Sequence, residues 1–170
     1  MQRVLVIGCS GSGKTTLAMQ VADHLQLPYI NLDEHYWQPG WTPTPMSQWH
    51  AISNELADRP AWIMDGTYGS TLQYRLQKAD TVVYLDMSTW TCLYRVASRT
   101  VRYLGHTRPQ MTDGCPERFD IDFLHYILSY RITRRKKHLA VIKRYSSVKS
   151  VHILRGPTAV KDWLASMVDE

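Results

Sequence analysis

The stretch Gly8-Cys9-Ser10-Gly11-Ser12-Gly13-Lys14-Thr15-Thr16 matches the pattern G-x-x-x-x-G-K-[ST] at every fixed position. It follows the short apolar run Val4-Leu5-Val6-Ile7 and precedes a helical pattern of apolar residues that extends to about Leu25. The glycines let the backbone curl so that successive N–H groups point at phosphate oxygens, and the helix adds the positive end of its dipole. A strand, this loop and a helix in that order predict a site for the phosphates of a nucleotide.

The residue types in this loop indicate which cofactors it holds. Lys14 is expected to reach the β- and γ-phosphates, and the Thr15 hydroxyl is expected to be a Mg²⁺ ligand. The sequence has no Asn-Lys-x-Asp motif of the kind with which GTPases recognise their base, and ATP with Mg²⁺ is the predicted cofactor. The predicted phosphate-binding residues are Gly8, Ser10, Gly11, Ser12, Gly13, Lys14, Thr15 and Thr16.

Length and composition limit the class of protein. The chain has 170 residues, of which 44% are hydrophobic and 21% charged, and this suits one globular domain over residues 1–170 rather than a disordered chain, a collagen or a coiled coil. No apolar run approaches the roughly 18 residues of a membrane span, and residues 4–8 are too short a run for a signal peptide. Three scattered cysteines without a CxxC pair predict no disulfide framework and fit a reducing cytoplasm.

Basic residues are concentrated in one part of the chain. Residues 95–155 contain 14 of the 20 Lys and Arg residues but only four acidic residues, and the remainder is acidic on balance. So basic a segment predicts an anionic partner, either a phosphorylated small molecule or a nucleic acid backbone. Composition alone leaves both open.

Short apolar runs alternate with amphipathic segments along the whole chain. The apolar runs predict strands over residues 4–7, 28–32, 62–64, 81–85 and 151–154. Helices are expected over residues 14–25, from an N-cap at Ser47, over 70–78 and 89–103, after Asp120 and from Thr158. Strands and helices in alternation predict an α/β fold with a parallel sheet and helices on both faces. Ligands of such sheets bind beyond the carboxyl ends of the strands.

Four segments of the sequence resemble the adenylate-kinase-like P-loop kinases that are often labelled "DNA topology modulation proteins". They are Gly8–Thr16, Leu32–Trp41, Trp62–Tyr68 and the stretch from Arg108-Pro109 through Cys115-Pro116-Glu117-Arg118. The resemblance extends over nearly the whole chain. It implies the P-loop NTPase fold of nucleoside-monophosphate-kinase type, with a five-stranded parallel sheet in the order 2-3-1-4-5, and it leaves the acceptor of the phosphoryl group undefined.

Three aspartates follow predicted strands. The resemblance implies that Asp65 holds a water of the Mg²⁺ shell, although Asp-Gly is also a common turn. Asp33 ends the second strand, where related small-molecule kinases position the acceptor, and its carboxylate is expected to orient a hydroxyl or take its proton. Asp86 is interpreted as a structural cap for the next helix.

The segment after Asp33 is rich in aromatic side chains. His35, Tyr36, Trp37 and Trp41 predict a stacking pocket for a sugar or a base within an acceptor-binding region over about residues 33–60. The alternative is a loop whose aromatic rings hold it against the core. Arg75, in the helix after the third strand, is expected either to bind an anionic acceptor or to be a solvated helix charge.

The resemblance also implies roles for the basic half. Arg95 and Arg99 lie at i, i+4 in the helix that enters a mobile lid, where they contact adenine and phosphates. The lid covers about residues 105–119, with Gly105 and Gly114 as hinges and with Arg108 and Arg118 at its flanks. Beyond it, Arg131, Arg134 and Arg135 share one helical face. The predicted catalytic residues are Lys14, Asp33, Arg118 and Arg131, and Gly156 and Pro157 are expected to cradle the adenine.

Two functions of different classes remain open from the sequence. The first is a cytoplasmic ATP-dependent kinase that transfers the γ-phosphoryl group, with Mg²⁺, to a nucleotide-like or hydroxyl-bearing small molecule. The second is a nucleic-acid-associated regulator in which ATP acts as a switch. It is not favoured, because the sequence carries no helix-turn-helix, zinc finger, RRM or KH signature. The oligomeric state is not predicted.

Overall fold

Five parallel strands form the central sheet of the computed structural model, which describes residues 1–168. The order is β2-β5-β1-β6-β7. The strands are β1 (Arg3–Gly8), β2 (Tyr29–Asn31), β5 (Trp62–Asp65), β6 (Thr81–Leu85) and β7 (Ser150–Leu154). Two further short strands, β3 (Trp37–Gln38) and β4 (Thr42–Pro43), pair as an antiparallel hairpin outside this sheet. Without that hairpin the order is the predicted 2-3-1-4-5, which is confirmed.

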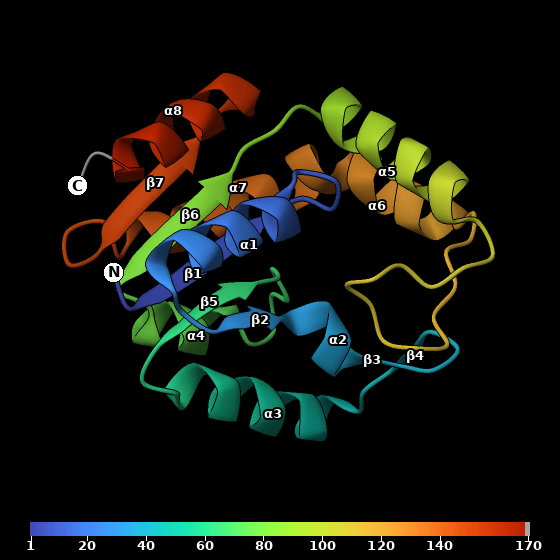
Figure 1. The fold of residues 1–170 in the computed structure, drawn as a ribbon, viewed down its shortest axis with the longest axis horizontal. Coiled ribbons are helices and arrows are strands. Elements are labelled where there is room, and N and C mark those ends of the chain that lie inside the picture. Colours follow the sequence, from blue (N-terminus) through green and yellow to red (C-terminus); the bar gives the residue numbers. More distant parts are fainter. Residues whose placement is uncertain (169–170) are drawn as a thin grey trace.

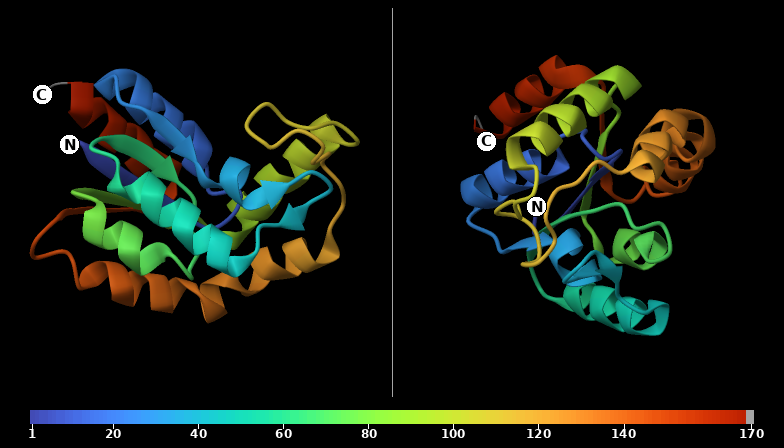
Figure 2. Two further views of the ribbon diagram at one scale, coloured as in Figure 1. Left: turned by 90° about the horizontal axis from the view of Figure 1, so that it is seen from below. Right: turned by 90° about the vertical axis from the view of Figure 1, so that its right-hand side faces the viewer.

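Helices cover both faces of the sheet (Figure 1). They are α1 (Lys14–Leu25), α2 (Leu32–Tyr36), α3 (Met46–Asp58), α4 (Leu72–Lys78), α5 (Thr89–Tyr103), α6 (Ile121–Thr133), α7 (Arg135–Lys143) and α8 (Gly156–Val168). Alternate residues of a strand point to opposite faces, so Val4 and Val6 pack with α1 and α8, and Leu5 and Ile7 pack with α3 and α4. Figure 2 shows α6 and α7 following one another along the molecule, with α7 on the side of α4 and α6 on the side of α5.

Three of the expected helices differ from the sequence predictions in their continuity or in their caps. The long helix expected after Asp120 is two helices, α6 and α7, which meet at Arg134. Ser47 is not an N-cap, because α3 already begins at Met46 after Pro45. The cap of α5 is Ser88, whose side chain accepts a hydrogen bond from the N–H of Thr91 at 3.0 Å.

Asp86 therefore has a different structural role from the one predicted. Its two carboxylate oxygens accept hydrogen bonds from Arg135 Nε and Nη2 at 2.7 and 2.6 Å. Arg155 Nε lies 3.7 Å from the same carboxylate. These contacts join the end of β6 to α7 and to the end of β7, and they hold the pKa of Asp86 below its usual range.

The acceptor side of the fold contains elements that the sequence did not predict. Asn31 ends β2, and its side chain accepts a hydrogen bond from the Asp33 N–H at 3.0 Å, which starts the short helix α2. The hairpin β3–β4 follows and turns at Gly40 and Trp41, both with positive φ. None of the helices described in residues 1–168 has the length and apolar character that a membrane crossing requires.

Candidate active site

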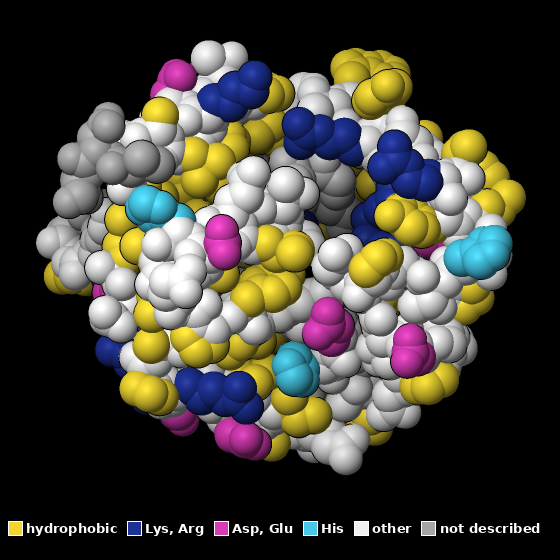
Figure 3. All heavy atoms as spheres, viewed as in Figure 1, with side chains coloured by type: hydrophobic (Ala, Val, Ile, Leu, Met, Phe, Trp, Pro, Cys, Tyr) yellow, Lys and Arg dark blue, Asp and Glu magenta, His cyan; other side chains and the backbone are white. Residues whose placement is uncertain are grey.

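One cavity of about 1030 Å³ opens at the carboxyl ends of the strands. Figure 3 shows a recess on this face of the molecule, bordered by Lys and Arg side chains. Fifteen predicted site residues line the cavity: Gly8, Ser10, Gly11, Gly13, Lys14, Thr15, Thr16, Asp33, Tyr36, Trp37, Trp41, Asp65, Arg95, Arg99 and Arg118. The predicted phosphate loop and most of the predicted acceptor side thus share one space.

The phosphate loop is held between β1 and α5. Gly11 has a φ of +77°, and a Cβ on it would collide with the carbonyl oxygen of Cys92, so the close approach of α5 requires glycine there. Arg95 Nη1 donates to the Ser12 carbonyl at 2.9 Å. Lys14 Nζ donates to the Cys9 carbonyl at 3.0 Å. The lysine thus lies over its own loop, next to the N-terminus of α1, where the helix dipole favours an anion.

Thr15 and Asp65 form the part of the site that suits a metal ion. Asp65 is the last residue of β5 and is buried. Burial raises the pKa of its carboxyl to about 6, and the nearby Thr15 hydroxyl opposes that rise. A hydroxyl and a carboxylate side by side, next to a phosphate loop, are the hard oxygen ligands that Mg²⁺ takes together with phosphate oxygens.

The buried Asp65 carboxyl predicts a pH-dependent stability. Because the pKa of Asp65 is higher in the folded chain than in the unfolded chain, the folded chain binds this proton more tightly. The free energy of unfolding should therefore fall as the pH rises from about 4 to about 6 and the buried carboxyl loses its proton. Asp65→Asn should then be more stable than the wild type at pH 8, by up to about 3 kcal/mol. Urea unfolding in metal-free buffer checks this. The two proteins should converge near pH 4, and an equal difference at pH 4 and pH 8 would rule the explanation out.

On the acceptor side, Asp33 is held by two neighbours. The Tyr68 hydroxyl donates to Asp33 Oδ1 at 2.5 Å, and Arg108 Nη2 lies 3.6 Å from Oδ2. The ring of Tyr36 packs 4.7 Å from that of Tyr68 and 5.0 Å from that of Trp37, measured between ring centroids. The rings of Tyr36, Trp37 and Trp41 line the cavity, and Tyr36 also packs against the core. The segment therefore has features of both alternatives, a lined pocket and a loop held against the core.

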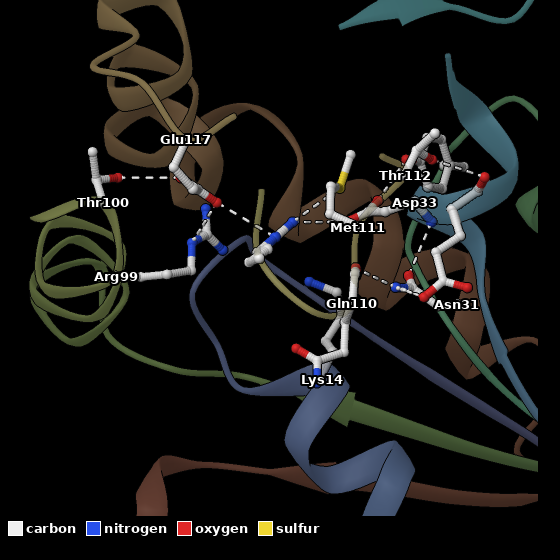
Figure 4. Close-up of polar contacts among 12 residues, drawn as sticks. Lys14, Asn31, Asp33, Arg99, Thr100, Gln110, Met111, Thr112 and Glu117 are labelled. Carbon is white, nitrogen blue, oxygen red and sulfur yellow. Dashed lines mark hydrogen bonds and ion pairs between the residues drawn. The ribbon is translucent and has the colours of Figure 1, made fainter. Parts of the chain in front are cut away.

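A buried carboxylate connects the lid to α5. Glu117 is 5% exposed, and its Oε1 lies 3.1 Å from Arg99 Nε and 3.4 Å from Arg108 Nε. Figure 4 shows Arg99 and Glu117 at one end of this chain of contacts and Asp33 at the other. Burial lowers the pKa of Arg99, and the nearby charge of Arg108 lowers it further. Arg108 thus bridges the lid carboxylate and the acceptor-side carboxylate.

The predicted lid is docked on the acceptor side of the cavity. Five hydrogen bonds join it to residues 31–41: Asn31 Nδ2 to Gln110 O (2.8 Å), Thr112 Oγ1 to Glu34 O (3.0 Å), Gly40 N to Gly114 O (2.8 Å), Trp41 Nε1 to Pro116 O (2.8 Å) and Cys115 Sγ to Gln38 O (3.2 Å). Gly114 lies within this contact, because a Cβ on it would be 3.0 Å from the Cβ of Pro39. Gly114 thus packs against Pro39 in this arrangement, and its role as a hinge stays a prediction.

Several predicted site residues lie away from the cavity. Arg75 is fully buried, donates to the carbonyls of Gly66, Thr67 and Tyr68 through its two Nη atoms, and does not line the cavity, so it is not placed to bind an anionic acceptor. Arg131 is exposed, and its Nη1 donates to the Met87 carbonyl at 3.3 Å. The other residues that do not line the cavity are Ser12, His35, Gly156 and Pro157. Gly156 instead begins α8. Among the arginines, Arg118 lines only the rim, with a side chain 61% exposed and 3.9 Å from Asp120.

Other residues of the cavity were not predicted as site residues. Tyr68, Arg108 and Glu117 line it. So do Tyr126 of α6, Arg134 between α6 and α7, and His138 of α7. Arg134 lies over the Tyr126 ring at 4.8 Å. A sequence signal existed for Arg108 and Arg134, which belong to the basic half. None existed for Glu117, whose role depends on burial between two arginines.

Comparisons with known proteins support the fold. No family model matches the chain, and no curated protein matches it. It is similar over 99% of its length to the shikimate kinase from Acinetobacter baumannii in complex with shikimate, with 18% identity, 92% of that chain covered and a TM-score of 0.60. The chain is also similar, over 99% of its length, to a sugar kinase from Janibacter sp. HTCC2649, with 18% identity, 95% of that chain covered and a TM-score of 0.53. A gluconokinase from Sinorhizobium meliloti 1021 is similar over the same share of this chain, with 17% identity, 94% of that chain covered and a TM-score of 0.52. This chain has the P-loop kinase fold.

Proposed function

We propose that the protein is an ATP-dependent kinase that transfers the γ-phosphoryl group, with Mg²⁺, to a hydroxyl of a small polar acceptor in the cytoplasm. The observation that carries the proposal is the shared cavity. The phosphate loop with Lys14 forms one wall, and Asp33 with its aromatic neighbours forms another. Transfer needs the two substrates side by side, and a cavity shared by these two walls meets that need.

Each side chain of the cavity has a physical task in such a transfer. Bound Mg²⁺, held through Thr15 and Asp65, would neutralise charge on the β- and γ-phosphates. Lys14 and Arg95 lie at the phosphate loop, where positive charge stabilises the equatorial oxygens of the transition state. Asp33 orients the acceptor hydroxyl and takes its proton as the new bond to phosphorus forms.

The acceptor side favours a hydroxyl-rich molecule over a nucleotide-like one. The high count of arginines suggested a phosphorylated acceptor, yet Arg75 and Arg135 are bound to backbone carbonyls and to Asp86. Arg108, the arginine beside Asp33, lies between that carboxylate and Glu117 and is already neutralised by both. The Asp33 carboxylate shares the cavity with the rings of Trp37 and Trp41, whose centroids are 5.5 Å apart. Carboxylates and aromatic faces suit a polyol, a sugar or a hydroxy acid. The similar solved structures are described as kinases of shikimate, a sugar and gluconate.

The charge argument for a nucleic-acid-associated regulator is weaker in the folded chain. Four of the 14 basic residues in residues 95–155 contact two buried carboxylates. Arg99 and Arg108 contact Glu117, and Arg135 and Arg155 contact Asp86. Paired arginines contribute less to the field that attracts a nucleic acid backbone. The kinase proposal accounts for the same residues within one cavity.

A screen of acceptors tests the proposal. Purified protein with Mg²⁺ and ATP is incubated with polyols, sugars, sugar acids, hydroxy acids, nucleosides and nucleoside monophosphates, and ADP release is measured after the rate with water alone is subtracted. A polyol, sugar or hydroxy acid that raises ADP release well above that rate is the expected result. ADP release that no member of the panel raises would contradict the proposal.

Arg108 and Arg118 provide a prediction about the lid. The Arg108 side chain is 16% exposed and contacts Asp33, whereas that of Arg118 is 61% exposed. Arg108→Ala should therefore lower kcat by about tenfold to a hundredfold, because its charge acts in a water-poor site. Arg118→Ala serves as the matched control and should change kcat by less than about threefold. A larger loss in Arg118→Ala than in Arg108→Ala would show that the docked arrangement is not the reactive one.

A further inference from the structure

A turn of three residues joins the two halves of the proposed site. Gly66, Thr67 and Tyr68 follow β5 directly. The Thr67 hydroxyl donates to the Gly8 carbonyl at 2.8 Å and accepts from the Gly8 N–H at 3.1 Å. The next side chain, Tyr68, donates to Asp33 Oδ1. Two adjacent side chains of one turn thus contact the first glycine of the phosphate loop and the acceptor-side carboxylate.

The backbone of this turn is in an unfavourable conformation. Tyr68 has a φ of +28°, which non-glycine residues rarely adopt. Gly66 has a φ of +129°, and a Cβ on it would lie 2.8 Å from the Cβ of Leu32. A strained turn keeps its shape only where the surrounding structure holds it. The contacts that hold the turn therefore decide where the Tyr68 hydroxyl lies.

Arg75 supplies those contacts from α4. Its side chain is completely buried, with Nη1 donating to the Gly66 carbonyl at 2.8 Å and Nη2 to the carbonyls of Thr67 and Tyr68 at 2.7 and 2.9 Å. No carboxylate forms an ion pair with it within the described part of the chain. A buried cation without a counter-charge is costly, and an apolar side chain would fill the same space. The planar fork of donors is the property that the turn uses.

We propose that Arg75 is a positioning residue, which fixes the turn Gly66–Tyr68 and thereby the Asp33 carboxylate relative to the phosphate loop. This inference rests on the proposed function. With Oδ1 bound by Tyr68, the oxygen that faces an acceptor hydroxyl is Oδ2, which lies 3.6 Å from Arg108. A carboxylate held in one orientation loses little rotational freedom in the transition state, and the transfer is faster for that reason.

The first test needs no acceptor. A double-mutant cycle of Tyr68→Phe and Asp33→Ala, measured by urea unfolding, gives the coupling between the two side chains, because alanine removes the acceptor that the amide oxygen of an asparagine would keep. We expect coupling in the wild-type background and its loss in an Arg75→Lys background, because a lysine ammonium keeps the charge but cannot bind three carbonyls in one plane. If Arg75→Lys does not fold, Arg75→Gln replaces it. Coupling that is absent in the wild-type background, or that persists without Arg75, overturns the proposal.

The second test uses the first acceptor of the panel that the wild-type protein phosphorylates. Tyr68→Phe should lower kcat about tenfold and leave the KM for ATP unchanged. Tyr74→Phe is the matched control, since Tyr74 on α4 also donates to a carboxylate, Asp58, at 3.0 Å, but on the surface. It should keep the wild-type kcat. Arg75→Lys should slow transfer like Tyr68→Phe, and the double variant should be no slower than the slower single variant.

The outcomes separate the inference from the proposed function. A wild-type protein that phosphorylates no acceptor contradicts the proposed function. A wild-type protein that does so, together with a Tyr68→Phe variant of equal kcat, contradicts the positioning role alone. The positioning role is also contradicted if the free-energy effects of Arg75→Lys and Tyr68→Phe on kcat add up in the double variant. Arg75 would then act independently of the Tyr68 hydroxyl.

Discussion

Lys14→Ala is expected to lower kcat by about a thousandfold and to leave the fold intact. The lysine is the cation of the phosphate loop, and its ammonium group contacts only the Cys9 carbonyl among the described residues. With this one contact, its charge is expected to contribute little to the stability of the folded chain, and in the proposed function it stabilises the transferring phosphoryl group. Steady-state kinetics, with circular dichroism and thermal unfolding as controls for the fold, measure both effects.

A matched control for Lys14→Ala is Lys161→Ala. Lys161 also lies in a helix, but it is an exposed residue of α8 and does not line the cavity. It should behave as the wild type in both measurements. A Lys14→Ala variant with wild-type phosphoryl transfer would mean that the phosphate loop has been assigned to the wrong chemistry.

Asp33→Asn is the second substitution with a large expected effect. Asparagine keeps the shape of the side chain but removes its charge and its ability to take a proton. Turnover with the acceptor should fall about a hundredfold or more, while the affinity for ATP should change little. Calorimetric titration with ATP and Mg²⁺ and single-turnover kinetics measure the two quantities separately.

Asp58→Asn is the control for Asp33→Asn. Asp58 also accepts a hydrogen bond from a tyrosine, Tyr74, and it pairs with Lys78, but on the surface of α3. This variant tests the loss of a tyrosine–aspartate contact without a change in the cavity, and its kcat should be that of the wild type. An Asp33→Asn variant with full kcat and a lowered melting temperature would make Asp33 a structural residue.

The strands of the sheet and the loop after the first strand could be predicted from local patterns, whereas the strand order followed from the resemblance to P-loop kinases. Residues 4–7 and 82–85 are continuous apolar runs, as strands buried on both faces require. They belong to β1, at the centre of the sheet, and to β6, next to it. The glycines and Lys14 of the loop follow a fixed spacing. The helix over residues 89–103 agrees with α5 at both ends.

The parts of the site that could not be predicted depend on contacts between distant segments. Arg75 looks like a surface charge in its own helix, and only the packed structure reveals that three carbonyls of another segment surround it. Asp86 was predicted to cap the next helix because it lies just before the start of that helix. Its actual partner, Arg135, lies 49 residues away in the sequence. The docking of the lid joins residues more than 70 apart.

The most direct test of the central claim follows the γ-phosphoryl group itself. Protein, Mg²⁺ and ATP labelled with ³²P at the γ-position are incubated with each polyol, sugar and hydroxy acid of the panel, and the labelled products are separated. The account predicts label in a phosphorylated acceptor, formed in an amount equal to the ADP released above the rate with water alone, and formed at least about a hundredfold more slowly in both Lys14→Ala and Asp33→Asn. Label found only in inorganic phosphate, whatever acceptor is present, would contradict it.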